Sequence, residues 1–289
     1  MSIWKKLHHH AHTGIEPFLK EREDFCVSAI SRFNGKIIEN VWASYGQKAD
    51  NESSVSALLL YGKQLLFPVF NFTPEKTAEY NNFGLPLPPL FPFLVRNKNI
   101  HAAQGMANDM GLLENALEGK GITPVSKYDY ELLHFDYSED LPVKTLPGLI
   151  IRRAEVSDTG RLFPLQAAYE KEEVLPKGAE FNPASCRRVL ESLIEENVIL
   201  TAELEGRLAG KININAESYN RFQIGGVYVL PEYRSQGIAR AMTAALINSF
   251  APQKKHFTLF VKIKNTPARR AYDSLGFKAI GEYRISYYT

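Results

Sequence analysis

The residues whose types and spacing point most clearly to chemistry lie between Val227 and Arg240. An apolar run ends at Leu230, and a short turn then leads into a segment of helical character. The unpaired N–H groups and the dipole at the start of such a helix favour a phosphate. Gly237 lets a phosphate approach the backbone, and Arg234 adds positive charge. This stretch predicts an anion site, although an ordinary helix start with surface arginines is the alternative.

Charge is distributed unevenly along the chain. Over 289 residues, 34 Lys and Arg side chains face 32 Asp and Glu, and the resulting formal charge of +2 does not point to nucleic acid or an anionic membrane as a partner. Between Leu230 and Thr289, however, ten basic residues stand against three acidic ones. Such a local excess would attract a multiply charged anion to the C-terminal end of the chain.

A second motif follows at residues 265–277, with the sequence Asn-Thr-Pro-Ala-Arg-Arg-Ala-Tyr-Asp-Ser-Leu-Gly-Phe. Together with the pattern Arg234-x-x-Gly237-x-Ala239 and the order of predicted elements, this motif resembles the GNAT superfamily of acyl-CoA-dependent N-acyltransferases. The resemblance covers residues 149–289, about half of the chain.

The resemblance implies acetyl-CoA as the co-substrate. Backbone amides after Arg234 would hold its pyrophosphate, and the pantetheine arm would lie along the strand that ends near Val229, where it splays from the strand around Phe257–Val261. The expected binding residues are Val227, Tyr228, Val229, Arg234, Ser235, Gln236, Gly237, Ile238, Ala239 and Asn265. We expect no metal, because His8, His9, His10 and His12 lack the spacing of a metal site.

Attack of an amine on a thioester needs a donor for the oxyanion and an acid for the departing thiolate. A strand N–H near Val229 could serve the oxyanion, and Tyr272 matches the family tyrosine that protonates the thiolate. The alternative for Tyr272 is packing on an amphipathic helix. The candidate general bases are Glu173 and, after it, Glu217, with a water relay as a further route. For Glu173 an ordinary solvated helix end is the commoner explanation.

The predicted fold class is α/β (mixed α+β), with a central, mixed, mostly antiparallel twisted sheet flanked by helices in the C-terminal domain. The glycines Gly225 and Gly226 indicate a bulge, a close ligand approach or a tight bend in a strand. The predicted elements are strand 149–153, helices 158–173 and 182–196, hairpin strands 198–204 and 208–215, strand 222–230, helix 236–250, strand 256–263, helix 267–275 and a pair of short strands within 277–288.

The first half, residues 1–145, reads as a second α+β domain, and residues 146–289 as the catalytic domain. We expect the first domain to be a degenerate copy of the same fold that shapes the acceptor site or an oligomer interface. It has a predicted hairpin, 55–61 with 65–70, whose Pro68 suggests an edge strand. Residues 71–92 are rich in Pro and Asn and predict irregular structure.

We therefore expect an acetyl-CoA-dependent N-acetyltransferase acting on a small amine or amino-acid-like acceptor. The alternatives are a non-catalytic acyl-CoA-binding or regulatory protein and, less favoured, a tandem transferase that uses aminoacyl-tRNA. The first domain could also support a homodimer, with a second copy of the chain as the partner. Two widely spaced cysteines, no signal-like N-terminus and no apolar run long enough for a bilayer favour a cytoplasmic protein without membrane partners.

Overall fold

The computed structural model describes residues 4–7, 14–47, 53–88, 100–143, 146–176 and 178–288. The chain divides into two compact units: unit 1 comprises residues 1–132 and 281–289, and unit 2 comprises residues 133–280. The domain border expected at residue 145 and the histidines from His8 to His12 fall outside the described residues. The described part of the chain holds no helix with the length and apolar character that crossing a membrane requires.

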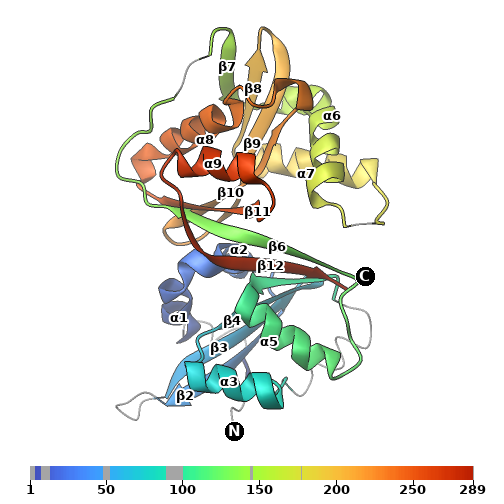
Figure 1. The fold of residues 1–289 in the computed structure, drawn as a ribbon, viewed down its shortest axis with the longest axis vertical. Helices are drawn as coiled ribbons and strands as arrows, with labels where there is room; N and C mark the ends of the chain where they lie inside the picture. Colours follow the sequence, from blue (N-terminus) through green and yellow to red (C-terminus); the bar gives the residue numbers. More distant parts are fainter. Residues whose placement is uncertain are drawn as a thin grey trace. The chain divides into compact units, whose positions relative to one another are not determined.

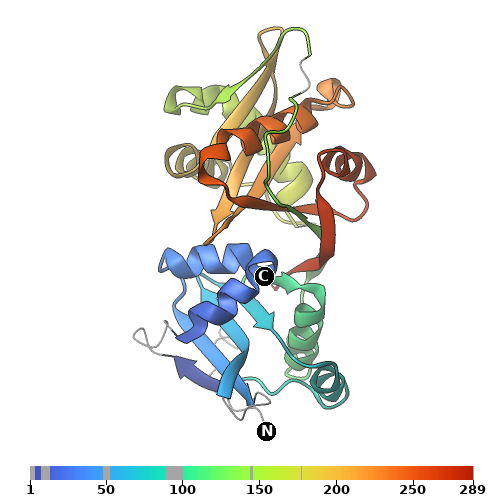
Figure 2. The same cartoon turned by 90° about the vertical axis from the view of Figure 1, so that its left-hand side faces the viewer.

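Unit 1 is built on a sheet in the order β1-β2-β3-β4-β5-β12-β6, in which β4 and β5 are parallel. Figures 1 and 2 show α1 and α2 on one side of this sheet and α3 and α5 on the other. Its elements are β1 (Trp4–Leu7), α1 (Glu16–Glu21), α2 (Glu23–Asn34), β2 (Asn40–Gln47), β3 (Ser53–Gly62), β4 (Leu65–Phe70), α3 (Pro74–Phe83), β5 (Ala102–Met106), α5 (Ala107–Glu118), most of β6 (Ser126–Phe135) and most of β12 (Lys278–Tyr287).

Both faces of this sheet are buried, as expected for strands covered by helices on two sides. On β3, Leu59 packs with Trp42 and with Leu113 of α5, whereas its neighbours Leu58 and Leu60 point to the opposite face and are also fully buried. The core of unit 1 therefore consists of two layers, one on each side of the sheet.

Two expectations for this unit were wrong. Pro68 does not mark an edge strand, because β4 lies between β3 and β5. The proline is tolerated since the ladder to β5 covers only Leu65 and Leu66, so no hydrogen bond is lost at its nitrogen. Residues 71–92 are not wholly irregular, because α3 begins at Pro74 with its N-terminus capped by the Thr73 side chain.

Unit 2 has a mixed, mostly antiparallel sheet in the order β6-β11-β10-β9-β8-β7, with β10 and β11 parallel, which confirms the predicted fold class. Its elements are β7 (Leu149–Arg153), η2 (Val156–Asp158), α6 (Thr159–Tyr169), η3 (Glu170–Val174), α7 (Pro183–Glu196), β8 (Ile199–Leu204), β9 (Arg207–Glu217), β10 (Arg221–Val229), η4 (Pro231–Tyr233), α8 (Ile238–Ser249), η5 (Ala251–Gln253), β11 (His256–Lys262) and α9 (Thr266–Asp273). The predicted pair of short strands at the end of the chain is a single strand, β12.

Helices cover both faces of the unit 2 sheet as well (Figure 1). On one face, Met242 of α8 packs with Ile212 and Phe257 in the larger core cluster. On the other face, Leu165 of α6 and Leu190 of α7 pack in a second cluster that includes Tyr228 of β10. Side chains of β9 and β10 therefore alternate between these two layers.

The described elements of the two units follow the same order along the chain. Each has a strand, two helices, three antiparallel strands, a helix, a strand parallel to the last, a helix and a final strand. Along the chain the first set is β1, α1, α2, β2 to β4, α3, β5, α5 and β6, and the second set is β7, α6, α7, β8 to β10, α8, β11, α9 and β12, although most of β12 belongs to unit 1. Such a repeat is what a duplicated fold would leave.

Candidate active site

Strand β10 carries a bulge at Gly225 and Gly226. Its pairing with β9 passes through Gly225 opposite Asn213 and then Tyr228 opposite Lys211, so that two residues of β10 face one of β9. Gly226 has a φ of 56°, a left-handed conformation that glycine adopts without strain. The structure therefore confirms the bulge that the glycine pair predicts.

Beyond the bulge, β10 and β11 diverge. Their parallel ladder reaches the pair Ile224 and Leu259, and within the described residues it goes no further. At the end of β10, Leu230 donates its N–H to the carbonyl of Ala209 on the β9 side at 2.9 Å. Because successive backbone groups of a strand alternate in direction, the N–H of Val229 faces the diverging β11.

The segment after β10 enters α8 through two left-handed residues. Ser235 has a φ of 64°, and Gly237, at the N-cap of α8, has a φ of 86°. No side chain caps this helix, and a Cβ placed on Gly237 would have nothing within 4 Å. The residues from Arg234 to Gly237, including Gln236, are exposed, whereas Ile238 is buried and Ala239 is half-buried. The first amides of α8 therefore start at an open, uncapped surface.

Arg234 is engaged by the protein itself. Its Nε donates to the carbonyl of Val229 at 3.0 Å, and its Nη2 lies 2.9 Å from both carboxylate oxygens of Glu172. The Tyr228 hydroxyl donates to the same carboxylate at 2.7 Å. The bond from Arg234 holds the pKa of Glu172 below its usual range, and burial raises the pKa of Tyr228 to about 12. The sequence analysis missed Glu172, which anchors Arg234 and Tyr228 together.

Glu173 reaches the other side of the divergence. Its carboxylate lies 2.8 Å from Nζ of Lys262, the last residue of β11, and the two side chains are 28% and 31% exposed. Glu173 is therefore partly buried and paired with a lysine. Since Glu172 binds groups of β10 and its following segment, the π-helical turn η3 ties together the ends of the two diverging strands.

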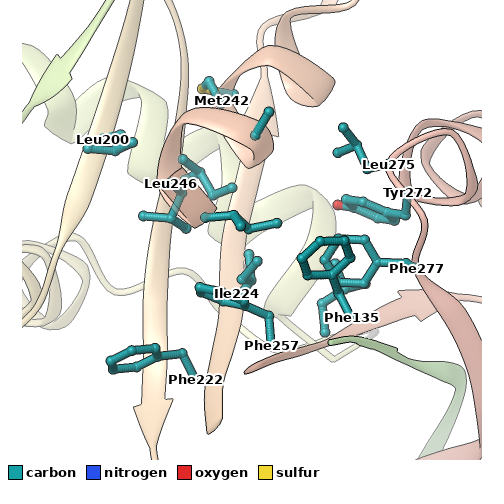
Figure 3. Close-up of a cluster of buried hydrophobic side chains, with 14 of the residues drawn as sticks. Phe135, Leu200, Phe222, Ile224, Met242, Leu246, Phe257, Tyr272, Leu275 and Phe277 are labelled. Atoms are coloured by element: carbon teal, nitrogen blue, oxygen red, sulfur yellow. The ribbon is translucent and has the colours of Figure 1, made fainter. Parts of the chain in front are cut away.

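Tyr272 of α9 lies in the larger core cluster of unit 2. It is 5% exposed, and its ring packs against Phe277 with 5.8 Å between the ring centroids, close to Phe135 and Leu275 (Figure 3). Burial raises the pKa of Tyr272, and the charge of Glu173 raises it further. The hydroxyl is therefore protonated at neutral pH, as a proton donor must be. The packing role that the sequence allows is present in the structure.

Asn265 and Glu217, two other predicted site residues, lie in different parts of the sheet and its following segments. Asn265 is the N-cap of α9, where its side-chain oxygen accepts from the N–H of Ala268 at 3.2 Å. Glu217 pairs with Lys255 and lies opposite Phe222, at the end of β10 away from the bulge. The structure therefore does not bring Glu217 together with the bulge, although it places Asn265 directly after β11.

Three polar side chains of β9, missed in the sequence, lie across the bulge: Lys211, Asn213 and Asn215. Lys211 Nζ donates to the carbonyl of Gly226 at 3.0 Å and to Asn213 Oδ1 at 3.2 Å, and Asn213 Nδ2 donates to Asn215 Oδ1 at 2.7 Å. Lys211 and Asn213 are buried, and Asn215 is exposed. The signal was the alternation Lys-Ile-Asn-Ile-Asn, which puts three polar residues on one face of a buried strand.

Comparisons with known proteins agree with this geometry. Residues 165–277 match the Acetyltransferase (GNAT) family. A mycothiol acetyltransferase from Acidothermus cellulolyticus is 29% identical over 111 residues, which span 33% of this chain and 34% of that protein, about a third of its length.

Two solved structures share the fold over both units. A GCN5-related N-acetyltransferase from Sphaerobacter thermophilus has a TM-score of 0.59 at 15% identity, covering 99% of this chain and 94% of its own. A tandem GNAT protein from the clavulanic acid biosynthesis pathway has a TM-score of 0.53 at 12% identity, covering 100% and 99%. Residues 165–277 of unit 2, which include the bulged β10, the diverging β11 and the uncapped start of α8, are therefore the part of the chain that is similar to the GNAT family.

Proposed function

We propose that the protein is an acetyl-CoA-dependent N-acetyltransferase whose acceptor is a small amine or an amino-acid-like molecule. The observation that carries this proposal is the divergence of β10 and β11 beside the uncapped start of α8 in a GNAT-family domain. The mycothiol acetyltransferase that resembles residues of this chain supports acetyl transfer as the chemistry.

Unit 2 offers groups that fit both ends of acetyl-CoA. The pyrophosphate would bind the amides from Ser235 to Ala239, where Gly237 leaves the approach open. The pantetheine arm would run along the edge of β10 from Val227 through Tyr228 to Val229, next to Asn265 at the start of α9. The basic C-terminal stretch would favour the approach of such an anion.

The transfer would proceed by direct attack on the thioester. The nitrogen lone pair of the neutral acceptor forms the new C–N bond, the carbonyl oxygen takes up charge opposite the N–H of Val229, and the C–S bond breaks. Tyr272 would give its proton to the thiolate, and Glu173 would take the proton of the amine. The two residues interact electrostatically, since the negative charge of Glu173 contributes to the raised pKa of Tyr272.

The proposal is tested by thiol release from acetyl-CoA in the presence of a panel of primary amines and amino acids. Acceptor-dependent release with at least one amine, and formation of the N-acetyl product by mass spectrometry, would support it. Tight acetyl-CoA binding with no release for any amine would instead support a non-catalytic acyl-CoA-binding protein. Transfer that needs aminoacyl-tRNA and does not use acetyl-CoA would reject the proposal and support a tandem transferase that uses aminoacyl-tRNA.

A further inference from the structure

Lys211 is a buried, ionisable side chain that the acetyl-transfer steps above do not use. Its side chain is 0% exposed, and within the described residues it forms no ion pair with a carboxylate. Taking an amine out of water without a counter-charge is costly, and the burial lowers the pKa of Lys211 to about 7. Because burying this amine is unfavourable, we examine which groups its side chain binds.

The partners of Lys211 belong to the bulge of β10. Its Nζ donates to the carbonyl of Gly226 and to Asn213, and the ring of Tyr169 lies 4.5 Å from Nζ. A Cβ on Gly226 would come within 1.8 Å of Asn213 Oδ1 and 2.6 Å of Lys211 Nζ. The second glycine, Gly225, meets the same row of side chains, since a Cβ there would lie 1.8 Å from the amide of Asn215. Both glycines are therefore required by the polar row of β9.

The bond to Gly226 fixes the direction of one peptide group. In a trans peptide the C=O and the following N–H point in opposite directions, so holding the carbonyl of Gly226 also sets the direction of the N–H of Val227. A bulge disrupts the regular ladder, and this peptide belongs to the bulged segment, so the ladder alone does not orient it. The hydrogen bond from Lys211 therefore orients this peptide group where the ladder does not.

We propose that Lys211 is a positioning residue of the transferase site: it holds the Gly226–Val227 peptide so that the backbone N–H groups after the bulge face the carbonyl oxygen of the bound acetyl thioester. This inference rests on the proposed function, because it assumes that the acetyl group lies beside the bulge. Lys211 acts only through the backbone and does not contact the substrate.

The inference predicts a binding signature that does not depend on the acceptor. Wild-type protein should bind acetyl-CoA about fivefold more tightly than CoA, the value of one hydrogen bond to the acetyl carbonyl. Lys211→Met keeps most of the length of the side chain but removes the donor, so the two ligands should bind it equally well. Its affinity for CoA should stay within about twofold of wild type, because the pyrophosphate site at α8 is not altered. Isothermal titration calorimetry with CoA and acetyl-CoA measures all of these values.

A matched control lies next in the chain. Ile212→Val removes one methylene from the opposite face of the same strand, where Ile212 is fully buried in the core. It should lower thermal stability and leave the preference for acetyl-CoA intact. Steady-state kinetics give a second readout. Lys211→Met should lower kcat about tenfold with little change in the KM for acetyl-CoA, which a loss of stability alone would not do.

Each outcome of the titration decides the question. Preserved acetyl preference in folded Lys211→Met, or a loss of CoA affinity as large as that of acetyl-CoA, would overturn the inference, as would equal binding of both ligands by wild type. If circular dichroism shows that Lys211→Met does not fold, Lys211→Leu decides, since it also removes the donor to Gly226 but places a smaller apolar side chain in the buried position, and it should lose the preference alone. Failure of wild type to bind either ligand would instead overturn the proposed function, and the inference with it.

Discussion

Units 1 and 2 repeat one order of elements, yet they differ where the third antiparallel strand ends. In unit 2, α8 begins without a side-chain cap at left-handed Gly237. In unit 1, the corresponding helix α3 begins at Thr73 and Pro74, and the Thr73 hydroxyl accepts from the N–H of Lys76 at 3.3 Å. One helix start is open to an anion, and the other is closed by its own side chain.

The strands that precede these two helices, β4 in unit 1 and β10 in unit 2, also end differently. Phe70 ends β4 as Val229 ends β10, and in both cases the next residue donates its N–H to the neighbouring antiparallel strand. In unit 1, however, the N–H of Phe70 donates to the buried carboxylate of Asp109 at 3.0 Å. Asp109 lies three residues after the end of β5, the same distance at which Asn265 follows β11. In unit 1 a carboxylate of the chain itself therefore accepts from the N–H that corresponds to that of Val229 in unit 2.

This difference shows how two units can share one fold while only one of them has an uncapped helix start after its third antiparallel strand. The layers, the order of elements and the parallel strand pair are common to both units, whereas the loop and the backbone groups that would hold acetyl-CoA occur in unit 2 alone among the described residues. The fold alone therefore does not distinguish the two units; the residues at the end of one strand do.

A charge at the helix start should produce the largest effect. Gly237→Asp would put a carboxylate where the pyrophosphate is expected, and we predict a loss of acetyl-CoA affinity of roughly 1,000-fold by calorimetry. Gly84→Asp is the matched control in unit 1, since Gly84 also has a positive φ, 84°, and open space around its Cβ. Equal losses in both variants would remove the distinction between the units.

The buried tyrosines of the two units should differ in their effect on turnover. Tyr272→Phe should lower kcat about 100-fold and leave the KM for acetyl-CoA within twofold, because only the proton donor is lost. Tyr283→Phe, at a tyrosine of unit 1 that is 2% exposed, should leave kcat unchanged. Steady-state thiol release measures both, and unchanged turnover in Tyr272→Phe would reject the acid role.

The two units should respond to pH with opposite signs. Burial raises the pKa of Asp109 to about 7, so the folded state keeps a proton that the unfolded state loses near pH 4, and unit 1 loses stability as pH rises from about 4 to 7. Burial lowers the pKa of Lys211 to about 7, so the unfolded state holds the extra proton up to about pH 10, and unit 2 gains stability from pH 7 to 10. Each slope should be at most roughly 1.4 kcal/mol per pH unit.

Hydrogen exchange of amides in β4 and β9 over this pH range measures the two slopes separately. Asp109→Asn should flatten the slope in unit 1 and leave that in unit 2, and Lys211→Met should do the reverse. A slope in β4 that survives Asp109→Asn would show that another group is responsible.

The helix caps should give the smallest effect. Asn265→Ala and Thr73→Ala each remove a side chain that caps a helix, α9 in unit 2 and α3 in unit 1, and each should cost about 1 kcal/mol in urea unfolding. The substitution in unit 2 should in addition weaken acetyl-CoA binding severalfold. If neither variant changes acetyl-CoA affinity, Asn265 serves only as a cap.

Local signals explain why much of unit 2 could be predicted from the sequence. The start of α7 follows from Asn182 and Pro183, because the side-chain oxygen of one and the fixed φ of the other act within one turn. In the structure the N–H of Ser185 donates to the side chain of Asn182. The same signal at Thr73 and Pro74 was overlooked within a stretch rich in proline, and α3 was missed with it.

The parts of the site that were missed depend on distant packing. Lys211 looks like a surface residue in a hairpin until α6 brings Tyr169 over it, and Glu172 differs from its acidic neighbours only because Arg234 and Tyr228 reach it across the fold. Likewise, Pro68 suggests an edge because the sequence cannot show where the ladder to β5 stops. Burial and long-range pairing, rather than residue type, make these residues special.

The central claim is that unit 2 binds acetyl-CoA along β10 and that unit 1 does not bind it along β4. A crystal structure of the full chain with acetyl-CoA tests this claim most directly. The account predicts one ligand per chain, with its pyrophosphate at the amides of residues 235–239 and its acetyl carbonyl facing the N–H groups after the Gly225–Gly226 bulge. A ligand bound elsewhere, or a second one on β4 in place of the Asp109 carboxylate, would contradict it.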